Sequence, residues 1–271
     1  MANRKRTRWR KLMIDEVMML RHGRTQYNLE HRLQGQIDVP LDIVGQWQVD
    51  QTGFALASRY YWAKVNRLAE HPEAIAQPGP DAAERTDTRQ FEEAPAAGRR
   101  MVVMTSDLFR AQQTAHAFAD ILGLPVTCDQ RLRERSFGDW EGIAVEELAK
   151  RFPEDYLSWA QFRGGELKYG AEPKQNVGRR GVEALNDWAS KAGSDTDLYV
   201  FSHGAWISQT LQTLLGMADA HGDFADILSM RNAHWVRLAP LELQGALRWR
   251  LVDYNHGPAI ADTEQWEHPQ L

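Results

Sequence analysis

Three short and almost uninterrupted apolar segments recur along the chain, at residues 17–20, 101–105 and 198–201. Strands of a parallel sheet are buried on both faces and have continuous apolar sequences, so these segments predict parallel strands. Helical spacing of apolar residues marks the segments at about 45–68, 108–122, 144–151, 177–191 and 205–215. This alternation predicts an α/β fold, with helices on both faces of a mostly parallel sheet in a three-layer α/β/α sandwich.

Two further regions differ from this pattern. Residues 233–238 and 247–252 read as strands with Gly245 in the turn between them, which predicts an antiparallel hairpin at the edge of the sheet. The stretch at about 70–100 is rich in Ala, Pro, Glu and Arg, and is interpreted as an inserted loop without assigned chemistry. We therefore predict a single domain over residues 1–271 that carries this insertion and a basic leader at 1–12.

Composition narrows the class of protein. No apolar run approaches the roughly 20 residues that cross a bilayer, so we expect no membrane partner. The single cysteine, Cys128, excludes internal disulfides, and no Cys/His cluster has the spacing of zinc ligands. We accordingly expect a cytoplasmic protein with no bound metal and no cofactor, and leave a homodimer open.

The basic leader contains six Lys or Arg residues but no apolar core of a secretory signal. It fits either an arm for nucleic acid or a solvated leader. The net charge of the chain is −5, and no second basic block with interleaved aromatic residues occurs. These features favour the solvated leader, so no nucleic-acid partner is expected.

The most distinctive polar residues follow the first predicted strand, as Arg21-His22-Gly23. A neutral and well-oriented imidazole is a nucleophile, and it can attack a phosphoryl group whose charge is neutralised by nearby cations. Arg21 supplies such a cation next to His22. From the tripeptide alone, a structural histidine at a strand end remains the alternative.

Polar residues follow the other two predicted strands as well, with Arg110 after the second and His203-Gly204 after the third. The carboxyl ends of parallel strands share one edge of the sheet, where ligands of open α/β sheets bind. Two arginines and two histidines in one small volume favour an anion such as phosphate. We also expect the helix that starts after Gly204 to offer backbone N–H groups to that anion.

A phosphoester needs a proton on its leaving oxygen, so a carboxyl group with a raised pKa is expected near the cluster. Glu134 is the candidate. The alternative is that Glu134 only pairs with the flanking Arg133 or Arg135. Asp139 and Glu141 are competing candidates for the acid in the same segment.

Four motifs in order resemble those of the histidine phosphatase superfamily, the phosphoglycerate mutase-like family. The first is Leu20-Arg21-His22-Gly23-x-Thr25-x-x-Asn28, followed by Arg32-Leu33-Gln34-Gly35-Gln36. The others are Ser106-x-Leu108-x-Arg110, Leu132-Arg133-Glu134 with Phe137-Gly138-x-Trp140-Glu141-Gly142, and Ser202-His203-Gly204.

This resemblance implies that His22 forms a phosphohistidine and that Glu134 protonates the leaving oxygen and then activates water. Arg21, Arg110 and His203 would bind the transferring oxygens. Asn28, Gln34, Thr25, Gly35 and Gly204 would complete the substrate-binding residues. For Asn28 and Gln34 the alternatives are a cap and a turn residue, and Thr25 has the alternative of supporting the loop.

The flanking residues favour hydrolysis, because family mutases carry Trp-Asn where this chain has Tyr27-Asn28. The motifs are similar to those of actinobacterial glucosyl-3-phosphoglycerate phosphatases, which implies a small phosphorylated metabolite such as glucosyl-3-phosphoglycerate or a phosphoglycerate as substrate. A cofactor-dependent phosphoglycerate mutase is the alternative, and a pseudo-enzyme that binds phosphoesters is another. The sequence departs from the family pattern at Glu172-Pro173, where many phosphatases of the family have Glu-Ser.

Overall fold

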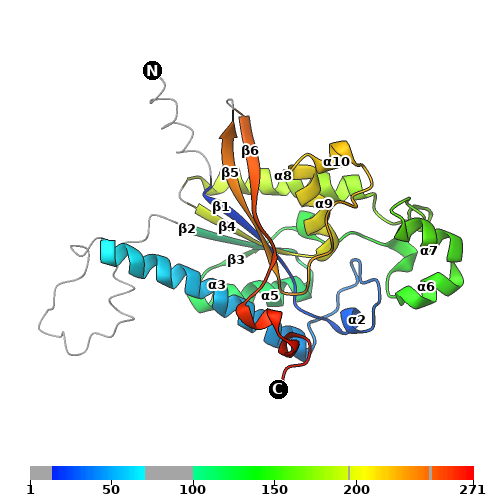
Figure 1. Ribbon diagram of the computed structural model, residues 1–271, viewed down its shortest axis with the longest axis horizontal. Helices are drawn as coiled ribbons and strands as arrows, with labels where there is room; N and C mark the ends of the chain where they lie inside the picture. The colour runs from blue at the N-terminus through cyan, green and yellow to red at the C-terminus, as the bar shows by residue number, and fades with distance from the viewer. Residues whose placement is uncertain (1–13, 71–99, 195, 244–245) are drawn as a thin grey trace, which may run out of the picture.

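The computed structural model describes residues 14–70, 100–194, 196–243 and 246–271 (Figure 1). The predicted basic leader and nearly all of the predicted insertion lie outside the described residues, and the single-domain organisation stays a prediction. Within the described part of the chain, no helix is both long and apolar enough to cross a membrane.

The described strands form one six-stranded sheet in the order β3-β2-β4-β1-β5-β6. Their bounds are β1 Glu16–Arg21, β2 Arg100–Thr105, β3 Val126–Cys128, β4 Thr196–Ser202, β5 Trp235–Leu243 and β6 Ala246–His256. The first four are parallel, whereas β5 and β6 form the predicted antiparallel hairpin at one edge. The predicted, mostly parallel sheet is therefore confirmed.

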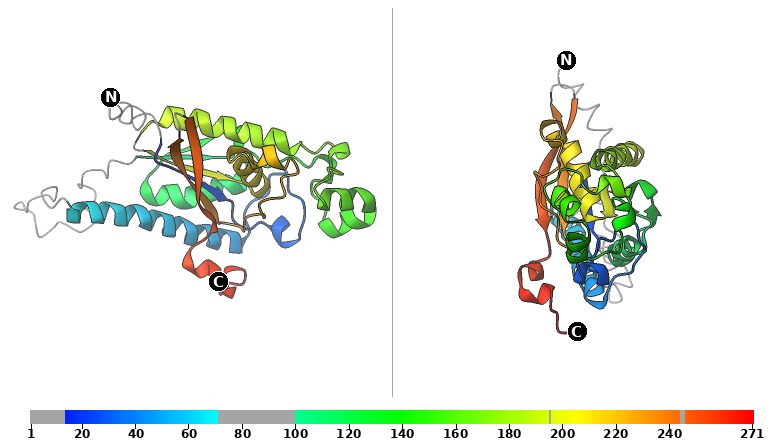
Figure 2. Two further views of the ribbon diagram at one scale, coloured as in Figure 1. Left: turned by 45° about the horizontal axis from the view of Figure 1, so that its top comes forward. Right: turned by 90° about the vertical axis from the view of Figure 1, so that its right-hand side faces the viewer.

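Helices cover both faces of this sheet, as predicted (Figure 2). On one face lie α3 (Ile43–Glu70) and α5 (Phe109–Ala119), and on the other lie α8 (Lys174–Ala192) and α9 (Gly204–Leu214). The shorter helices are α2 Gln26–Leu29, α6 Val145–Arg151, α7 Pro153–Ala160 and α10 Met217–Ala220.

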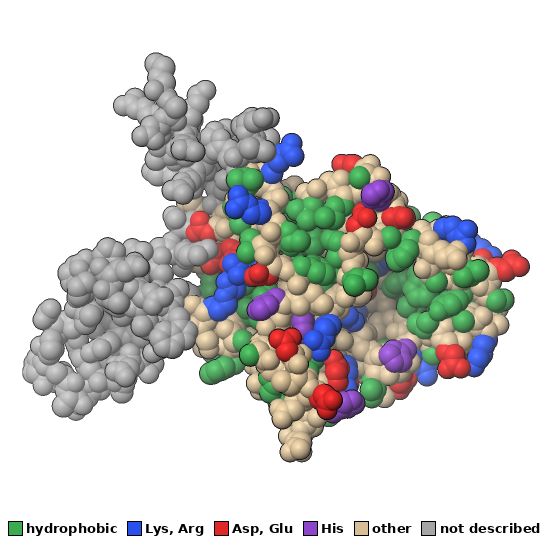
Figure 3. Space-filling view, viewed as in Figure 1, with side chains coloured by type: hydrophobic (Ala, Val, Ile, Leu, Met, Phe, Trp, Pro, Cys, Tyr) green, Lys and Arg blue, Asp and Glu red, His purple; other side chains and the backbone are tan. Residues whose placement is uncertain are grey.

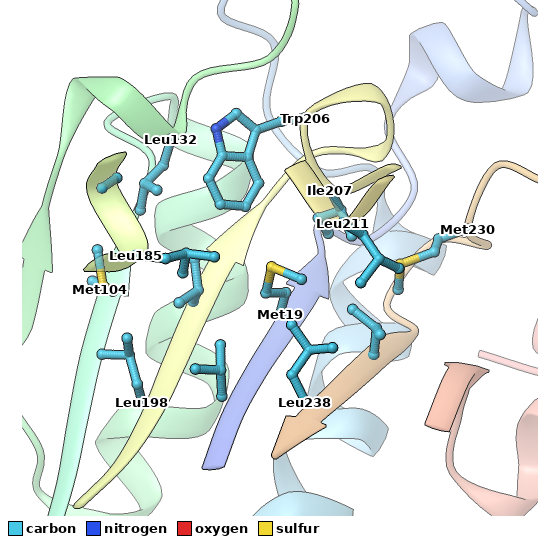
Figure 4. Close-up of a cluster of buried hydrophobic side chains, with 14 of the residues drawn as sticks. Met19, Met104, Leu132, Leu185, Leu198, Trp206, Ile207, Leu211, Met230 and Leu238 are labelled. Carbon is cyan, nitrogen blue, oxygen red and sulfur yellow. The ribbon is translucent and has the colours of Figure 1, made fainter. Parts of the chain in front are cut away.

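Each face has its own apolar core. Met19, Leu198 and Val236 of the sheet pack with Leu185 of α8 and Ile207 of α9 (Figure 4). On the opposite face, side chains of β1, β2 and β4 pack against α3 and α5. Because successive side chains of a strand point to opposite faces, continuous apolar strands supply both cores.

Residues 137–169, which include α6 and α7, form a lobe beside the edge toward which the parallel strands point (Figure 1). Its own small core contains the fully buried Trp140, which packs against Phe152, Trp159 and Tyr169. Figure 3 shows a hollow in the surface between this lobe and the rest of the molecule. The fold thus places the polar strand ends at an edge flanked by a separate lobe.

Candidate active site

The two histidines named by the sequence lie next to each other. In the parallel pair of β1 and β4, Arg21 is level with Ser202, and the N–H of His22 donates to the Ser202 carbonyl at 3.0 Å. The rings of His22 and His203 have centroids 5.2 Å apart and planes at 61°. His22 is 2% exposed and His203 is fully buried. The register of the sheet therefore brings both imidazoles to one point.

The His22 ring is held in one tautomer. Its Nδ1 lies 2.7 Å from the carbonyl oxygen of Gly23. Since a carbonyl only accepts, Nδ1 carries the proton and Nε2 keeps its lone pair in the neutral ring. Burial lowers the pKa of His22 well below its ordinary value, and Arg110 and Arg21 lower it further. His22 is thus neutral near pH 7, with a free Nε2.

Arg110, at the start of α5, is fully buried and has no carboxylate partner among the described residues. Its Nη1 and Nη2 donate to the carbonyls of Ile37 and Gly35, each at 2.8 Å, and its Nε has no described partner. Burial lowers the pKa of Arg110 to about 10, although Glu134 and Asp38 act in the opposite direction. A bound anion would restore the missing charge compensation.

The backbone conformation at position 35 and the close approach of Glu141 both require a glycine there. Its φ is +51°, a conformation that side chains disfavour, and a Cβ there would lie 2.0 Å from Oε1 of Glu141. This backbone conformation belongs to the turn whose carbonyls hold Arg110. Gly35 therefore acts on the site through its backbone.

Arg21 and His203 also present polar atoms without described partners. The Nη1 of Arg21 donates to the Met230 carbonyl, but its Nε is buried and unpaired. Both ring nitrogens of His203 are unpaired, and burial, followed by Arg110, lowers the pKa of His203 well below its ordinary value. A Cβ on Gly204 would come within 3.3 Å of Arg21 Nε, so the glycine leaves room for the guanidinium.

Unpaired buried polar groups are rare in native proteins and require an explanation. Other such groups occur elsewhere in the described residues, but those of Arg21, Arg110 and His203 lie together at the ends of β1 and β4 and the start of α5, beside the His22 imidazole. In the described part of the chain, no group of three His, Cys, Asp or Glu side chains is arranged to hold a metal ion. Arg21 and Arg110 place positive charge next to both histidines.

Glu134 reaches this edge, and its carboxylate lies at the N-terminus of α9. Oε1 accepts from the backbone N–H of Arg135 at 2.8 Å and of Trp206 at 2.9 Å, and Oε2 accepts from the N–H of Ala205 at 3.2 Å. The expectation that these helix N–H groups serve the substrate anion is therefore wrong for Ala205 and Trp206. A helix N-terminus attracts a negative charge, and the carboxylate of Glu134 takes that place.

The flanking arginines do not pair with the Glu134 side chain. Arg133 forms an ion pair with Asp107 at 2.6 Å, and the side chain of Arg135 pairs with Glu166 at 2.6 Å. The alternative in which Glu134 only neutralises a neighbour is thereby excluded. The Glu134 carboxylate is instead close to Arg21 and Arg110, where its negative charge partly offsets the lowering of both pKa values by burial.

The two competing carboxylates of this segment are differently placed. Oε1 of Glu141 accepts from the backbone N–H groups of Gln36 and Phe137 and from the Ser136 hydroxyl. Asp139 is exposed. Glu141 thus stabilises the loop that contains Gly35, which leaves Glu134 as the carboxylate beside the histidines and arginines.

Thr25 and Asn28 form a capping box at the start of α2. The Thr25 hydroxyl accepts from the N–H of Asn28, and Oδ1 of Asn28 accepts from the N–H of Thr25 at 3.1 Å. Thr25 is fully buried, as expected for the supporting role that the sequence left open. Gln34 is 8% exposed, and its Oε1 has no described partner.

Two residues that sequence reasoning did not assign to the site support it. Arg180 of α8 forms an ion pair with Glu172 at 2.9 Å. It also donates to the carbonyls of Arg131, Arg133 and Glu134, which holds in place the segment that carries Glu134. Asn232 donates hydrogen bonds to residues 22–28, here called the nucleophile loop, which begins with His22. In the sequence, Asn232-Ala233-x-Trp235 is similar to a segment of the actinobacterial phosphatases, but that similarity gives Asn232 no role, and no local pattern marks Arg180. Both residues contact segments far away in the sequence.

A model of the histidine phosphatase superfamily (branch 1) matches residues 17–78 and 81–255. The chain belongs to this superfamily. The match spans all four motifs and each strand and helix that contributes to the site.

The chain is 29% identical over 265 residues to a glucosyl-3-phosphoglycerate phosphatase of Mycolicibacterium vanbaalenii, covering 93% of this chain and 99% of the relative. It is 30% identical to a probable phosphoglycerate mutase, GpmB, of Yersinia enterocolitica, covering 74% of this chain and 75% of the relative. A solved structure of mycobacterial glucosyl-3-phosphoglycerate phosphatase Rv2419c with VO3 superposes with a TM-score of 0.67 at 24% identity, covering 89% and 98% of the two chains. The last similarity supports the fold.

The neutral state of His22 is testable by pH titration. Because burial and the two arginines lower its pKa, His22 should stay neutral below pH 6.5, and the neutral nucleophile should persist on the acid side of that pH. Substituting Arg110→Met should move the pKa of His22 upward, since a nearby positive charge is removed. Nuclear magnetic resonance of histidine-labelled protein measures both.

Arg179→Met is the matched control, because Arg179 is exposed on α8. It should leave the His22 titration unchanged. A His22 that titrates at or above pH 6.5 in the unmodified chain would contradict the electrostatic description.

Proposed function

We propose that this chain hydrolyses phosphomonoesters of small metabolites through a phosphohistidine at His22. The observation that carries the proposal is a neutral His22, whose Nε2 keeps its lone pair, close to a buried Arg110 whose hydrogen bonds within the described residues go to backbone carbonyls. An uncharged nucleophile beside a buried cation suits a tetrahedral oxyanion.

In the first step, Nε2 of His22 attacks phosphorus and the bond from phosphorus to the ester oxygen breaks. Arg21, Arg110 and His203 bind the non-bridging oxygens, whose charge they stabilise during transfer. Protonated Glu134 gives its proton to the departing oxygen, which leaves as an alcohol. Oε2 is the oxygen suited to this transfer, because it accepts one N–H whereas Oε1 accepts two.

In the second step, the Glu134 carboxylate takes a proton from a water molecule that attacks the phosphohistidine. The bond from nitrogen to phosphorus breaks, inorganic phosphate leaves, and the lone pair returns to Nε2. Glu134 ends protonated, ready for the next ester. Asn28 and Gln34 contribute neutral polar groups to substrate binding.

Glucosyl-3-phosphoglycerate is the first candidate substrate. Its support is the similarity to the Mycolicibacterium phosphatase, which extends over 99% of that relative. A phosphoglycerate is the second candidate. The cationic cluster recognises the phosphoryl group that these esters share, and therefore does not itself discriminate among the attached alcohols.

A mutase is the alternative activity, and the comparisons support it less: the 30% identity to the Yersinia protein covers 75% of that relative, whereas the similarity to the Mycolicibacterium phosphatase covers 99% of its length. A mutase returns the phosphoryl group to a second hydroxyl of the substrate, whereas a hydrolase passes it to water. The two activities share the nucleophile.

The cytoplasmic location, the absence of a nucleic-acid partner and a homodimer stay predictions.

Phosphate release from glucosyl-3-phosphoglycerate, phosphoglycerates, sugar phosphates and nucleotides tests the proposal, with and without 2,3-bisphosphoglycerate. We expect release without that activator and in the presence of EDTA, because arginines and histidines provide the charge stabilisation. His22→Ala should abolish both turnover and acid-labile phosphorylation of the protein. Normal turnover by that variant, or strict dependence on the bisphosphate, would overturn the proposal.

The acid role of Glu134 makes a separate prediction. Glu134→Gln keeps the shape of the side chain but cannot donate a carboxylic proton, so alkyl phosphates should slow by about 100-fold or more. An aryl phosphate should be affected less in the phosphorylation step, because its leaving group needs little protonation. The phosphorylation rates come from single-turnover kinetics, and equal losses on both esters would refute the assignment.

A further inference from the structure

Asn232 connects the two ends of the nucleophile loop, His22-Gly23 and Asn28, through hydrogen bonds. It lies between α10 and β5, and its Nδ2 is 3.1 Å from the His22 carbonyl oxygen, 3.2 Å from that of Gly23 and 3.1 Å from Oδ1 of Asn28. Residues more than 200 positions apart in the sequence therefore meet at a single amide group.

The orientation of this amide follows from its partners. The carbonyls of His22 and Gly23 can only accept hydrogen bonds, so nitrogen rather than oxygen of the Asn232 amide faces them. Two hydrogens on Nδ2 serve three acceptors, which makes at least one of these bonds shared. A group without a donor at this position would remove a hydrogen bond from these acceptors, although each keeps another donor.

One of the three acceptors also fixes the nucleophile. The Gly23 carbonyl receives the hydrogen bond from Nδ1 of His22 at 2.7 Å, and this bond leaves Nε2 unprotonated. Asn232 donates to the same oxygen. Its amide therefore orients the carbonyl that selects the reactive tautomer.

The third acceptor orients a second amide. Oδ1 of Asn28 receives hydrogen bonds from the N–H and hydroxyl of Thr25 as well as from Asn232. With its oxygen fully used, Asn28 can present only its NH₂ group to a ligand. An amide NH₂ donates, as a phosphate oxygen requires.

The backbone around Asn232 holds it in place. The N–H of Ala233 donates to the carbonyls of Arg21 and His22, both at 3.1 Å, and the N–H of Arg21 donates to His234 at 3.0 Å. Ala233 has a φ of +57°, which an alanine adopts only where surrounding contacts impose it. This constrained turn brings the Asn232 side chain to the nucleophile loop.

We infer that Asn232 is a positioning residue for phosphoryl transfer, which sets the tautomer of His22 and turns the NH₂ of Asn28 toward the phosphoryl oxygens. The inference rests on the proposed function. Asn232 acts through His22, Gly23 and Asn28 and takes no proton in the reaction.

Two variants test this role, Asn232→Ala and the isosteric Asn232→Asp. Both should lower kcat by about 100-fold, since a misplaced reacting group costs on that order. Both should also weaken competitive inhibition by inorganic phosphate. In the aspartate variant alone, the new negative charge should raise the pKa of His22 and move the acid limb of kcat/KM to higher pH. A residue that only supported folding would lower thermal stability and leave that limb in place.

Asn186→Ala on the exposed face of α8 is the control and should behave as the unmodified chain. The nitrogen chemical shifts of His22 give a readout that needs no turnover. They should report the Nδ1–H form in the unmodified chain and a mixture of tautomers in the alanine variant.

The inference is overturned if both Asn232 variants keep a kcat within twofold of the control and the His22 tautomer is unchanged. An inactive unmodified chain would instead refute the proposed function, and the nitrogen shifts would still decide the role of Asn232. If the alanine variant does not fold, the aspartate variant carries the test.

Discussion

A buried guanidinium whose hydrogen bonds within the described residues go to backbone carbonyls is the constraint on which this site depends. Arg110 lies in the first turn of α5, and its two terminal nitrogens are fixed by the turn that contains Gly35 and Ile37. Carbonyl dipoles orient the side chain without cancelling its charge. The fold therefore keeps a full positive charge ready for an anionic ligand, at a cost in stability that its two apolar cores must offset.

This arrangement also determines the protonation state of His22 and His203. Burial beside Arg110 and Arg21 disfavours a second positive charge, so the pKa values of His22 and His203 fall and both rings are neutral near pH 7. One cationic cluster can thus serve two purposes, attracting the phosphoryl group and keeping the imidazole nucleophilic. Glu134 lies close to both arginines, but its carboxylate is held by the N–H groups that start α9.

Much of the fold was predictable because buried parallel strands leave a strong pattern. Val17–Leu20 and Leu198–Phe201 are almost entirely apolar and lie in the centre of the sheet. The strands β5 and β6 pair as the expected hairpin, whose predicted turn at Gly245 lies outside the described residues. The three-residue β3 is too short to show periodicity, and the four-residue α2 depends on the capping box of Thr25 and Asn28. The spacing of apolar residues therefore predicts neither element.

The site was predictable to the extent that its residues sit at strand ends or in contiguous motifs. His22, His203 and Arg110 gather because three strands share one edge. Asn232 and Arg180 act through carbonyls of distant segments, and only folded coordinates reveal such contacts. The same holds for the contacts of Glu134. Its carboxylate accepts the hydrogen bonds of the N–H groups at the start of α9, which the sequence had assigned to the substrate anion.

The most direct test of the central claim is the crystal structure of the protein with orthovanadate, which mimics the phosphoryl group in transfer. We expect vanadium bonded to Nε2 of His22, with its oxygens within hydrogen-bond distance of Arg21, Arg110 and His203. Vanadate bound away from these side chains, or a His22 ring that presents Nδ1 to it, would contradict the account.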